Sequence, residues 1–435
     1  MKTSRDLTFV INALSGGLTR AGNFLIALLF VPLAIKVMGV EGYGLVSVAI
    51  SLATFAAYAD LGLGIALTNT VAAVNLDDPD SARTRFARQM VSNAWFFLLA
   101  TGVTLAGVAF GFATLAQTTV HVVAALSCAI IFLGLPFGLY QRVLFARQHN
   151  LLASGSYTAG RFLVLLVVWA LAQVGTVTPV VFVMCLFGIP LAVNVIGTVV
   201  TFSSSRCSRL RPATQYTNAR AMPTELSMGL SFMLLQMVPF VEVGIDNALL
   251  ALNHPVATVS AYDVNYRLFA YVPAIMSLLL FPLWPAIAKA LSESDTGWVK
   301  KVRNLSYLSV GCASSVIAAV LFAFHETVIL HWTGESMPLD IMTIGAFACF
   351  SVVTSMTSVQ SMVLNGHGLI REQMRFFVVY LLFLLPLKLI ALWLFGITAM
   401  AWATVFAALV RFFVLWRMDQ RQWQSSHSPK DASHG

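Results

Sequence analysis

The sequence is poor in charge and shows no cysteine pairing pattern. Only 10% of its 435 residues are charged, whereas 58% are hydrophobic. A chain of this composition cannot bury its apolar surface in a water-soluble core, so we expect a lipid bilayer to cover much of it. The five cysteines stand far apart, without the spacing of a metal site or a disulfide framework, and are expected to be small core residues.

Motifs of catalysis are also missing. The chain has no GxSxG nucleophile elbow, no P-loop and no HExxH zinc motif. His325 and His331 lie near Glu326 and Glu335 in an expected outer loop, but they lack a scaffold with fixed spacing. We therefore expect no catalytic residue and no metal site. Basic residues are not interleaved with aromatics on a soluble module, so the net charge of +8 does not indicate nucleic acid binding.

Long apolar segments are what the sequence does contain. A helix that crosses a membrane needs about 20 mostly apolar residues. Segments of this kind occupy residues 14–36, 43–65 (continuing to 74), 92–114, 122–141, 153–171, 180–202, 229–249, 262–288, 304–324, 341–364, 376–393 and 399–416. They predict an all-α integral membrane protein with about 12 transmembrane helices.

The basic residues predict how these helices are oriented. Twenty of the 26 Lys and Arg residues fall in the N-terminus, the C-terminal tail and every second loop, and the six loops between these hold none. Cytoplasmic loops retain positive charge, so both termini are expected to be cytoplasmic. Most of the net charge then reflects the orientation of the chain in the membrane and does not indicate a ligand site. Arg142, in the expected inner loop 142–152, is one of these basic residues.

The longest inner loop divides the chain into two halves with equal orientation. We predict a six-helix lobe over 1–202, a cytoplasmic linker over 203–228, a second six-helix lobe over 229–416 and a cytoplasmic tail over 417–435. Gln141 near the end of the fourth helix and Gln360 near the end of the tenth lie at matching places. This layout favours parallel repeats related by an axis along the membrane normal.

Some basic residues lie within the expected spans and need another explanation. A charge at the centre of a lone helix costs roughly 2.5 to 3.5 kcal/mol on insertion scales, so such residues usually face protein or a wet cavity. Arg411 and Lys36 lie close to helix ends, where long side chains are expected to reach the lipid headgroups. Arg20, Arg161 and Arg267 are placed deeper, which favours a cavity.

Acidic residues pair at helical spacing in the second half. Glu242 and Asp246 are four residues apart and would share one face of a helix. Two carboxylates in a low-dielectric setting cannot both ionise cheaply, so one should hold a proton or share a cation. Lys388 is the expected internal counter-ion, and a structural salt bridge and a coupling-ion site both stay open. Asp263 and Arg267 have the same spacing and could neutralise each other.

The stretch YADLGLGIALTN, residues 58–69, interrupts the second span with a carboxylate. Counting inward from Tyr43, Asp60 lies near the cytoplasmic end of a helix that crosses a core of about 30 Å. Asp60 could cap a break between the spanning helix and an inner-face extension, or it could serve as a cytoplasmic gate. Gly62 and Gly64 allow close helix packing or a bend at this place.

This region resembles the opening of bacterial polysaccharide flippases of the Wzx type. Those proteins join helices one and two by a G-x-x-x-Y-G turn and carry a D-x-G-x-G pattern near the inner end of helix two. The matching residues here are Gly39, Tyr43 and Gly44, and Asp60, Gly62 and Gly64. The family lies in a superfamily that also holds multidrug and toxic-compound exporters and the lipid II flippase.

The resemblance implies a function and roles for several residues. Such flippases move an undecaprenyl-pyrophosphate-linked oligosaccharide across the bacterial inner membrane, for O-antigen, capsule or exopolysaccharide, by alternating access between two lobes around a central cavity. Relatives that flip lipid II hold the pyrophosphate with arginines on helices one and eight, which by helix and depth correspond to Arg20 and Arg267; Arg161 is assigned the same head-group role. Several relatives bind a coupling sodium or proton with acidic residues on helix seven, here Glu242 and Asp246.

The sequence departs from the sodium pattern, because helix eleven carries Lys388 where an oxygen ligand would be expected. We expect Glu242, Asp246 and Lys388 to form a charge switch, with no cofactor beyond a coupling proton or sodium. The expected partners are the lipid-linked oligosaccharide, membrane lipid, a polysaccharide polymerase and a chain-length regulator, and the protein is expected to be a monomer.

Two alternatives stay open. A multidrug or cation antiporter of the same superfamily would favour an acidic, aromatic-lined cavity. A membrane-embedded glycosyltransferase or polymerase of the polysaccharide pathway would need an acidic pair in an outer loop or a sizeable outer domain. The sequence shows neither of these last two features, so we expect a protein that is not an enzyme.

Overall fold

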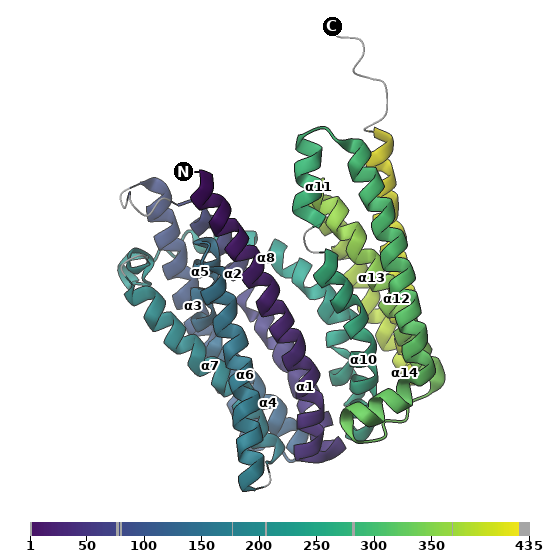
Figure 1. The fold of residues 1–435 in the computed structure, drawn as a ribbon. Helices are drawn as coiled ribbons and strands as arrows, with labels where there is room; N and C mark the ends of the chain where they lie inside the picture. Colours follow the sequence, from purple (N-terminus) through teal and green to yellow (C-terminus); the bar gives the residue numbers. More distant parts are fainter. Residues whose placement is uncertain are drawn as a thin grey trace. The chain divides into compact units, whose positions relative to one another are not determined.

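The structure is almost entirely helical (Figure 1). It is a computed structural model that describes residues 2–74, 78, 81–175, 177–204, 207–280, 283–367 and 369–425. The helices are α1 (Lys2–Ala57), α2 (Leu63–Ala72), α3 (Ala82–Leu115), α4 (Thr119–Gly134), α5 (Leu139–Ala146), α6 (Asn150–Val174), α7 (Pro179–Ser203), α8 (Met222–Pro239), α9 (Asp246–Leu250), α10 (Val256–Leu280), α11 (Leu283–Ser292), α12 (Thr296–Thr333), α13 (Ile341–Gly366) and α14 (Ile370–Ser425). Within these ranges the chain forms no β-strand.

The two longest helices each contain two of the predicted spans. Gly39 inside α1 has φ 72° and ψ 178°, and Gly396 inside α14 has φ 83° and ψ −167°. Neither conformation continues an α-helix, and a positive φ is readily adopted by glycine because it has no Cβ. Each glycine therefore marks a turn between two spans, in agreement with the breaks predicted near residues 37–42 and 394–398.

Other predicted spans are bent or interrupted. The fourth span consists of α4 and α5, which meet at an angle of 51° at Leu135. Pro136 and the following 3-10 turn, η2 (Pro136–Gly138), separate these two helices, since proline lacks the backbone N–H that a continuous helix needs. The seventh span consists of α8, a π-helical turn η5 (Phe240–Gly244) and α9.

The chain divides into two compact units. The first unit comprises Met1–Phe240 and Gly244–Ser260, and the second comprises Val241–Val243 and Ala261–Gly435. Helix α8 belongs to the first unit, where the backbone of α2 contacts it: a Cβ at Gly62 would lie 2.1 Å from the carbonyl oxygen of Gly229. The contact boundary thus lies beyond residue 229, and the lobe limits expected from the sequence stay a prediction.

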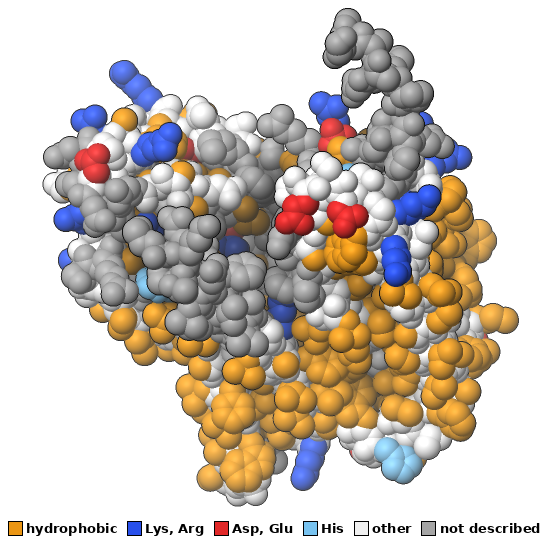
Figure 2. Space-filling view, turned by 45° about the horizontal axis from the view of Figure 1, so that its top comes forward, with side chains coloured by type: hydrophobic (Ala, Val, Ile, Leu, Met, Phe, Trp, Pro, Cys, Tyr) orange, Lys and Arg blue, Asp and Glu red, His pale blue; other side chains and the backbone are white. Residues whose placement is uncertain are grey.

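Each unit has its own core and an apolar exterior. In the first unit α2, α3 and α5 contribute most of a buried cluster that includes Leu67, Met90 and Tyr140. In the second unit Ile287, Val299 and Val363 join α11, α12 and α13. Large areas of hydrophobic side chains face outward, while many of the visible Lys and Arg side chains gather toward one end (Figure 2). Among the described residues, seven helices, or eight with the bent α4–α5 pair, are long and apolar enough to cross a membrane.

Candidate functional site

The sequence YADLGLG breaks the helix in the first unit. Residues Tyr58–Asp60 form a 3-10 turn, and the backbone then takes the left-handed conformation at Leu61 (φ 50°) and Gly62 (φ 72°) before α2 begins. Asp60 Oδ1 accepts a hydrogen bond from the Gly62 N–H at 2.8 Å, which holds the turn closed. A left-handed leucine is strained, and such strain is common at functional sites. The predicted break is present, and the gate role of Asp60 stays a prediction.

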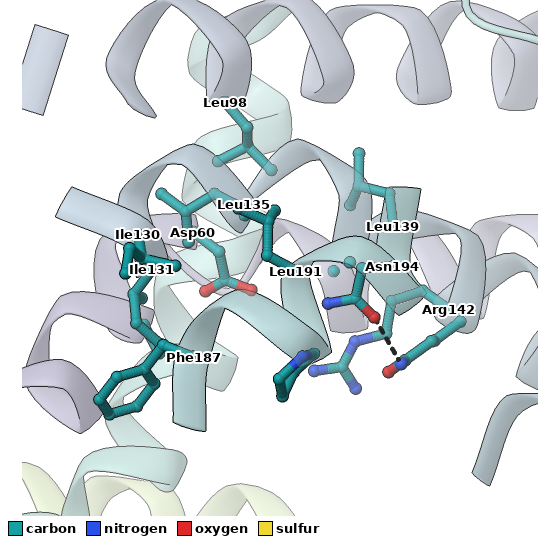
Figure 3. Close-up of a pocket in the computed structure, with 16 residues that line it drawn as sticks. Asp60, Leu98, Ile130, Ile131, Leu135, Leu139, Arg142, Phe187, Leu191 and Asn194 are labelled. Carbon is teal, nitrogen blue, oxygen red and sulfur yellow. Dashed lines mark hydrogen bonds between the residues drawn. The ribbon is translucent and has the colours of Figure 1, made fainter. Parts of the chain in front are cut away.

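A cavity with four polar side chains on a mostly apolar wall lies next to this turn (Figure 3). Its volume is roughly 240 Å³, and α4, α5 and α7 supply most of its walls. Its polar side chains are Asp60, Gln141, Arg142 and Asn194, and its apolar side chains include Leu135, Phe187 and Leu191. We call it the Asp60–Arg142 cavity. All of its lining residues belong to the first unit.

Arg142 lies in α5, beyond the bend at Leu135, and is half-buried. Figure 3 shows its guanidinium group extending toward the middle of the cavity that Asp60 enters from the other side. The two side chains come near each other above Gly64, because a Cβ there would lie 3.0 Å from Arg142 Nε and 3.3 Å from Asp60 Oδ2. No ion pair joins them, and Arg142 makes no hydrogen bond with any residue that the structure describes.

The sequence did not indicate this place of Arg142 on a cavity wall, and its expected part in the membrane topology stays a prediction. Its place at the edge of the basic inner loop 142–152 suggested a topology label, but the bend at η2 turns α5 and carries this side chain to the cavity. Thr198 in α7 fixes the bend by donating to the Phe137 carbonyl oxygen at 3.0 Å.

A hydrogen-bonded chain holds α5 against its neighbours. Gln141 Nε2 donates to Asn194 Oδ1 in α7 at 3.2 Å, as drawn in Figure 3, and to the Tyr140 hydroxyl at 3.4 Å. That hydroxyl lies 2.8 Å from Ser156 Oγ in α6. A Cβ at Gly197 would overlap the Tyr140 ring, so glycine at this place lets α5 and α7 approach closely. The cavity wall is thus fixed by packing and by polar contacts.

The second unit holds a buried charge network around Glu242, which lies in the π-helical turn η5. Its carboxylate accepts from the Tyr380 hydroxyl at 2.5 Å and forms an ion pair with Arg411 Nη1 at 2.7 Å. Lys388 Nζ donates to the backbone carbonyl oxygens of Glu242 at 2.6 Å and Val241 at 3.4 Å. Since Tyr380, Lys388 and Arg411 all come from α14, this Glu242 network fastens the π-helical turn to that helix.

One expectation for this region is corrected, and another stays open. The ion-pair partner of the Glu242 carboxylate is Arg411, and the role of Lys388 as counter-ion of the Glu242 and Asp246 pair stays a prediction. Arg411 was expected to extend to the lipid headgroups, but it is only 7% exposed. The Glu242 carboxylate takes the place of water as the partner of its guanidinium group. Its Nε and Nη2 atoms are buried without a hydrogen-bond partner among the described residues.

Asp246 is buried and begins α9. The shared face expected for Glu242 and Asp246 presumes a regular α-helix, and η5 interrupts that regularity between them. By its contacts Asp246 belongs to the first unit, whereas Glu242 belongs to the second. The charge switch of Glu242, Asp246 and Lys388 stays a prediction.

The remaining predicted residues are distributed over the chain's two units. Arg267 Nε donates to Asp263 Oδ2 at 2.6 Å, which is the ion pair that their spacing allowed. Arg20 is exposed on α1, and Arg161 is exposed on α6 with its guanidinium carbon 4.9 Å from the centre of the Tyr157 ring. Lys36 is exposed near the Gly39 turn, as expected for a side chain at a helix end. The head-group roles of the three arginines stay predictions.

Several residues of these sites were missed by sequence reasoning, namely Arg142, Gln141, Asn194, Tyr380 and Arg411. For the first two a signal was present: Pro136 within an apolar span, followed closely by the polar pair Gln-Arg. For Arg411 there was none, because its partner lies 169 positions away in the sequence. In the described part of the chain no group of three or more His, Cys, Asp or Glu side chains is placed to hold a metal ion.

Comparison with known proteins identifies the fold. No protein-family model and no curated protein sequence matches the chain. Among solved structures it is similar to an inward-facing multidrug resistance MATE family transporter of the MOP superfamily, with a TM-score of 0.67 and 15% identity over 93% of this chain and 96% of that one.

The fold is that of a MATE transporter. The multidrug transporter DinF-BH gives a TM-score of 0.61 with 15% identity over 96% and 94% of the two chains. A MOP superfamily transporter from Pyrococcus furiosus, whose reverse polarity of the binding pocket suggests a different function, gives 0.56 with 13% identity over 95% of each chain. These likenesses confirm an all-α, multi-pass membrane fold of twelve transmembrane helices in two lobes.

Proposed function

We propose that this protein is a flippase that moves an undecaprenyl-pyrophosphate-linked oligosaccharide across the bacterial inner membrane for surface polysaccharide synthesis. The observation that carries the proposal is the guanidinium group of Arg142, which faces a cavity and makes no hydrogen bond or ion pair with a described residue. Such a group would not help to bind a cationic drug. It would help to bind a pyrophosphate or an acidic sugar, because arginine binds oxyanions through two parallel hydrogen bonds.

The resemblance around Asp60 and the two-lobe fold support the same proposal. In this proposal Arg20, Arg161 and Arg267 contact the pyrophosphate, and Glu242, Asp246 and Lys388 change their pairing between the inward-open and outward-open states. The tethered cation of Arg411 already neutralises Glu242, which disfavours sodium as an ion bound by this carboxylate. The Pyrococcus furiosus transporter, whose reverse pocket polarity suggests a different function, is a precedent for a change of pocket charge in a similar fold.

The proposal also includes the location and the partners. Both termini face the cytoplasm, the lipid tail stays in the bilayer while the polar head crosses, and a polysaccharide polymerase and a chain-length regulator act on the product. The protein performs no covalent chemistry in this scheme.

A deletion strain that makes the polysaccharide tests the proposal. We expect completed lipid-linked repeat units to accumulate and surface polysaccharide to disappear. The native chain and Arg85→Ala, which removes an exposed arginine of α3, should restore export, whereas Arg142→Ala at equal protein level should not. Normal export in the deletion strain would refute the function. Missing sugars on the lipid carrier would instead indicate a glycosyltransferase.

The second candidate is a multidrug or cation antiporter. It is favoured by the carboxylate of Asp60, which lines the same cavity, and by two neighbours that are described as multidrug transporters. This alternative predicts that the deletion strain becomes sensitive to cationic drugs while its surface polysaccharide is unchanged. The flippase predicts the reverse result in both measurements.

A further inference from the structure

The Asp60–Arg142 cavity is small. Its volume is roughly 240 Å³. Pockets for drug-sized ligands are larger, at about 300 to 1,000 Å³. A group of monosaccharide size fits this cavity better than a whole drug molecule does.

One wall of the cavity donates hydrogen bonds. Arg142 carries five N–H groups in a planar fork that matches a carboxylate or a phosphate. No residue that the structure describes occupies this fork, and the side chain is only half-exposed. An oxyanion in the cavity would therefore meet a charged donor that is already directed toward it.

Asp60, which lines the same cavity, accepts hydrogen bonds. Asp60 uses one oxygen for the Gly62 N–H, and an ionised carboxylate accepts only. It would repel an oxyanion but bind a hydroxyl or an ammonium group. The ligand must then differ at its two ends, with negative charge toward Arg142 and donors toward Asp60.

We infer that this cavity binds a sugar residue that carries an oxyanion, with the oxyanion on Arg142 and a sugar hydroxyl or amino group on Asp60. The inference rests on the proposed function, because a lipid-linked oligosaccharide would supply the ligand. The oxyanion has two sources of the same chemistry: the carboxylate of an acidic sugar, or the phosphate that joins the first sugar to the lipid.

Gly64 leaves room for the side chains of Arg142 and Asp60, because it has no Cβ. It lies in α2 with ordinary helical backbone angles, so alanine is compatible with the backbone. The added Cβ would lie 3.0 Å from Arg142 Nε and 3.3 Å from Asp60 Oδ2, which forces one of them to move. Gly107 in α3 is a matched control, because a Cβ there meets nothing within 4 Å.

The test is ligand binding to the purified full-length chain in detergent, measured by calorimetric titration with glucuronate, glucose and inorganic pyrophosphate. We expect at least one anion to bind about tenfold or more tightly than glucose, since charge-assisted bidentate contacts are the strong ones. Arg142→Ala and Gly64→Ala should remove this preference, and Arg85→Ala and Gly107→Ala should keep it. Asp60→Asn should weaken glucuronate more than pyrophosphate.

The outcomes separate the two sources and the two proposals. Tighter glucuronate binding supports an acidic sugar as the source, and tighter pyrophosphate binding supports the lipid phosphate. If neither anion binds better than glucose, or if Arg142→Ala binds as the native chain does, the inference is wrong. Should Arg142→Ala fail to fold, Arg142→Lys and Gly64→Ala decide, because lysine keeps the charge but loses the fork. Anion binding together with normal export in the deletion strain would refute the flippase alone, and blocked export without anion binding would refute this inference alone.

Discussion

The two units treat buried charge in opposite ways. In the first unit Asp60 and Arg142 are half-buried on the walls of one cavity and form no ion pair with each other. In the second unit Glu242 and Arg411 are buried and closed on each other, with Tyr380 on the same carboxylate. Charges that close on each other fasten a structure, whereas charges that stay apart beside a cavity are available to a ligand.

The two units also share a feature, and the repeat expected from the sequence stays a prediction. Gln141 near the end of the fourth span donates to Asn194 in α7, the sixth span. Gln360 near the end of the tenth span, α13, donates to the Phe412 carbonyl oxygen in the last part of α14, the twelfth span. In each unit a glutamine thus ties equivalent helices together. The two units therefore differ in how their charged side chains are paired, although a glutamine contact of this kind is present in both.

Breaking the closed network should give the largest effect on stability. Arg411→Ala leaves the Glu242 carboxylate buried without its cation, and we expect the free energy of unfolding to fall by about 3 to 5 kcal/mol. The measurement is chemical unfolding in detergent. Arg417→Ala, which removes an exposed arginine of the same helix, is the control and should change little. An Arg411→Ala chain as stable as the control would show that the pair fastens nothing.

Removing one hydrogen bond of the same network should cost less. Tyr380→Phe deletes the hydroxyl that Glu242 accepts from and keeps the ring, so the expected loss is about 1.5 to 3 kcal/mol, typical of a hydrogen bond to a charged group. The same unfolding experiment measures it. A loss equal to that of Arg411→Ala would mean that the hydroxyl contributes as much as the ion pair to holding the π-helical turn.

The open site should respond in the opposite sense. Arg142→Met removes a charge that makes no hydrogen bond or ion pair with a described residue, so stability should change by no more than about 1 kcal/mol, as for other substitutions that break no bond. Export should nevertheless fall strongly. Unfolding and export measured on the same preparations check this. A large loss of stability together with the loss of export would show that Arg142 stabilises the fold. The first unit would then not differ from the second in the role of its charged residues.

The smallest expected effect concerns sodium. Because Arg411 already supplies a cation to Glu242, replacing sodium by potassium in a transport assay should leave the rate unchanged. A clear requirement for sodium would show that the Glu242 network opens to admit an ion.

Much of the fold could be predicted from the sequence, because apolar length and Lys/Arg alternation act locally along the chain. The turns at Gly39 and Gly396, the break after Asp60 and the Asp263–Arg267 pair belong to this predictable part, since glycine, turn residues and i,i+4 spacing decide them within a few positions.

The chemistry of both sites was less predictable. Arg142 counted as a loop residue until the bend at Leu135 showed where α5 directs it. Arg411 looked like a helix-end residue, since nothing near it in the sequence announces a partner in η5. Whether a buried charge closes on a partner or faces a cavity depends on tertiary packing, which hydropathy and spacing do not report.

The most direct test of the flippase proposal is the initial rate at which undecaprenyl-pyrophosphate-linked oligosaccharide crosses the bilayer of proteoliposomes containing the purified chain. We predict rapid crossing with the native chain and with Arg85→Ala. We predict a rate lower by about tenfold or more with Arg142→Ala, in line with the loss of one charged bidentate contact. Equal rates for Arg142→Ala and the native chain, at equal protein content and stability, would contradict the central role of Arg142.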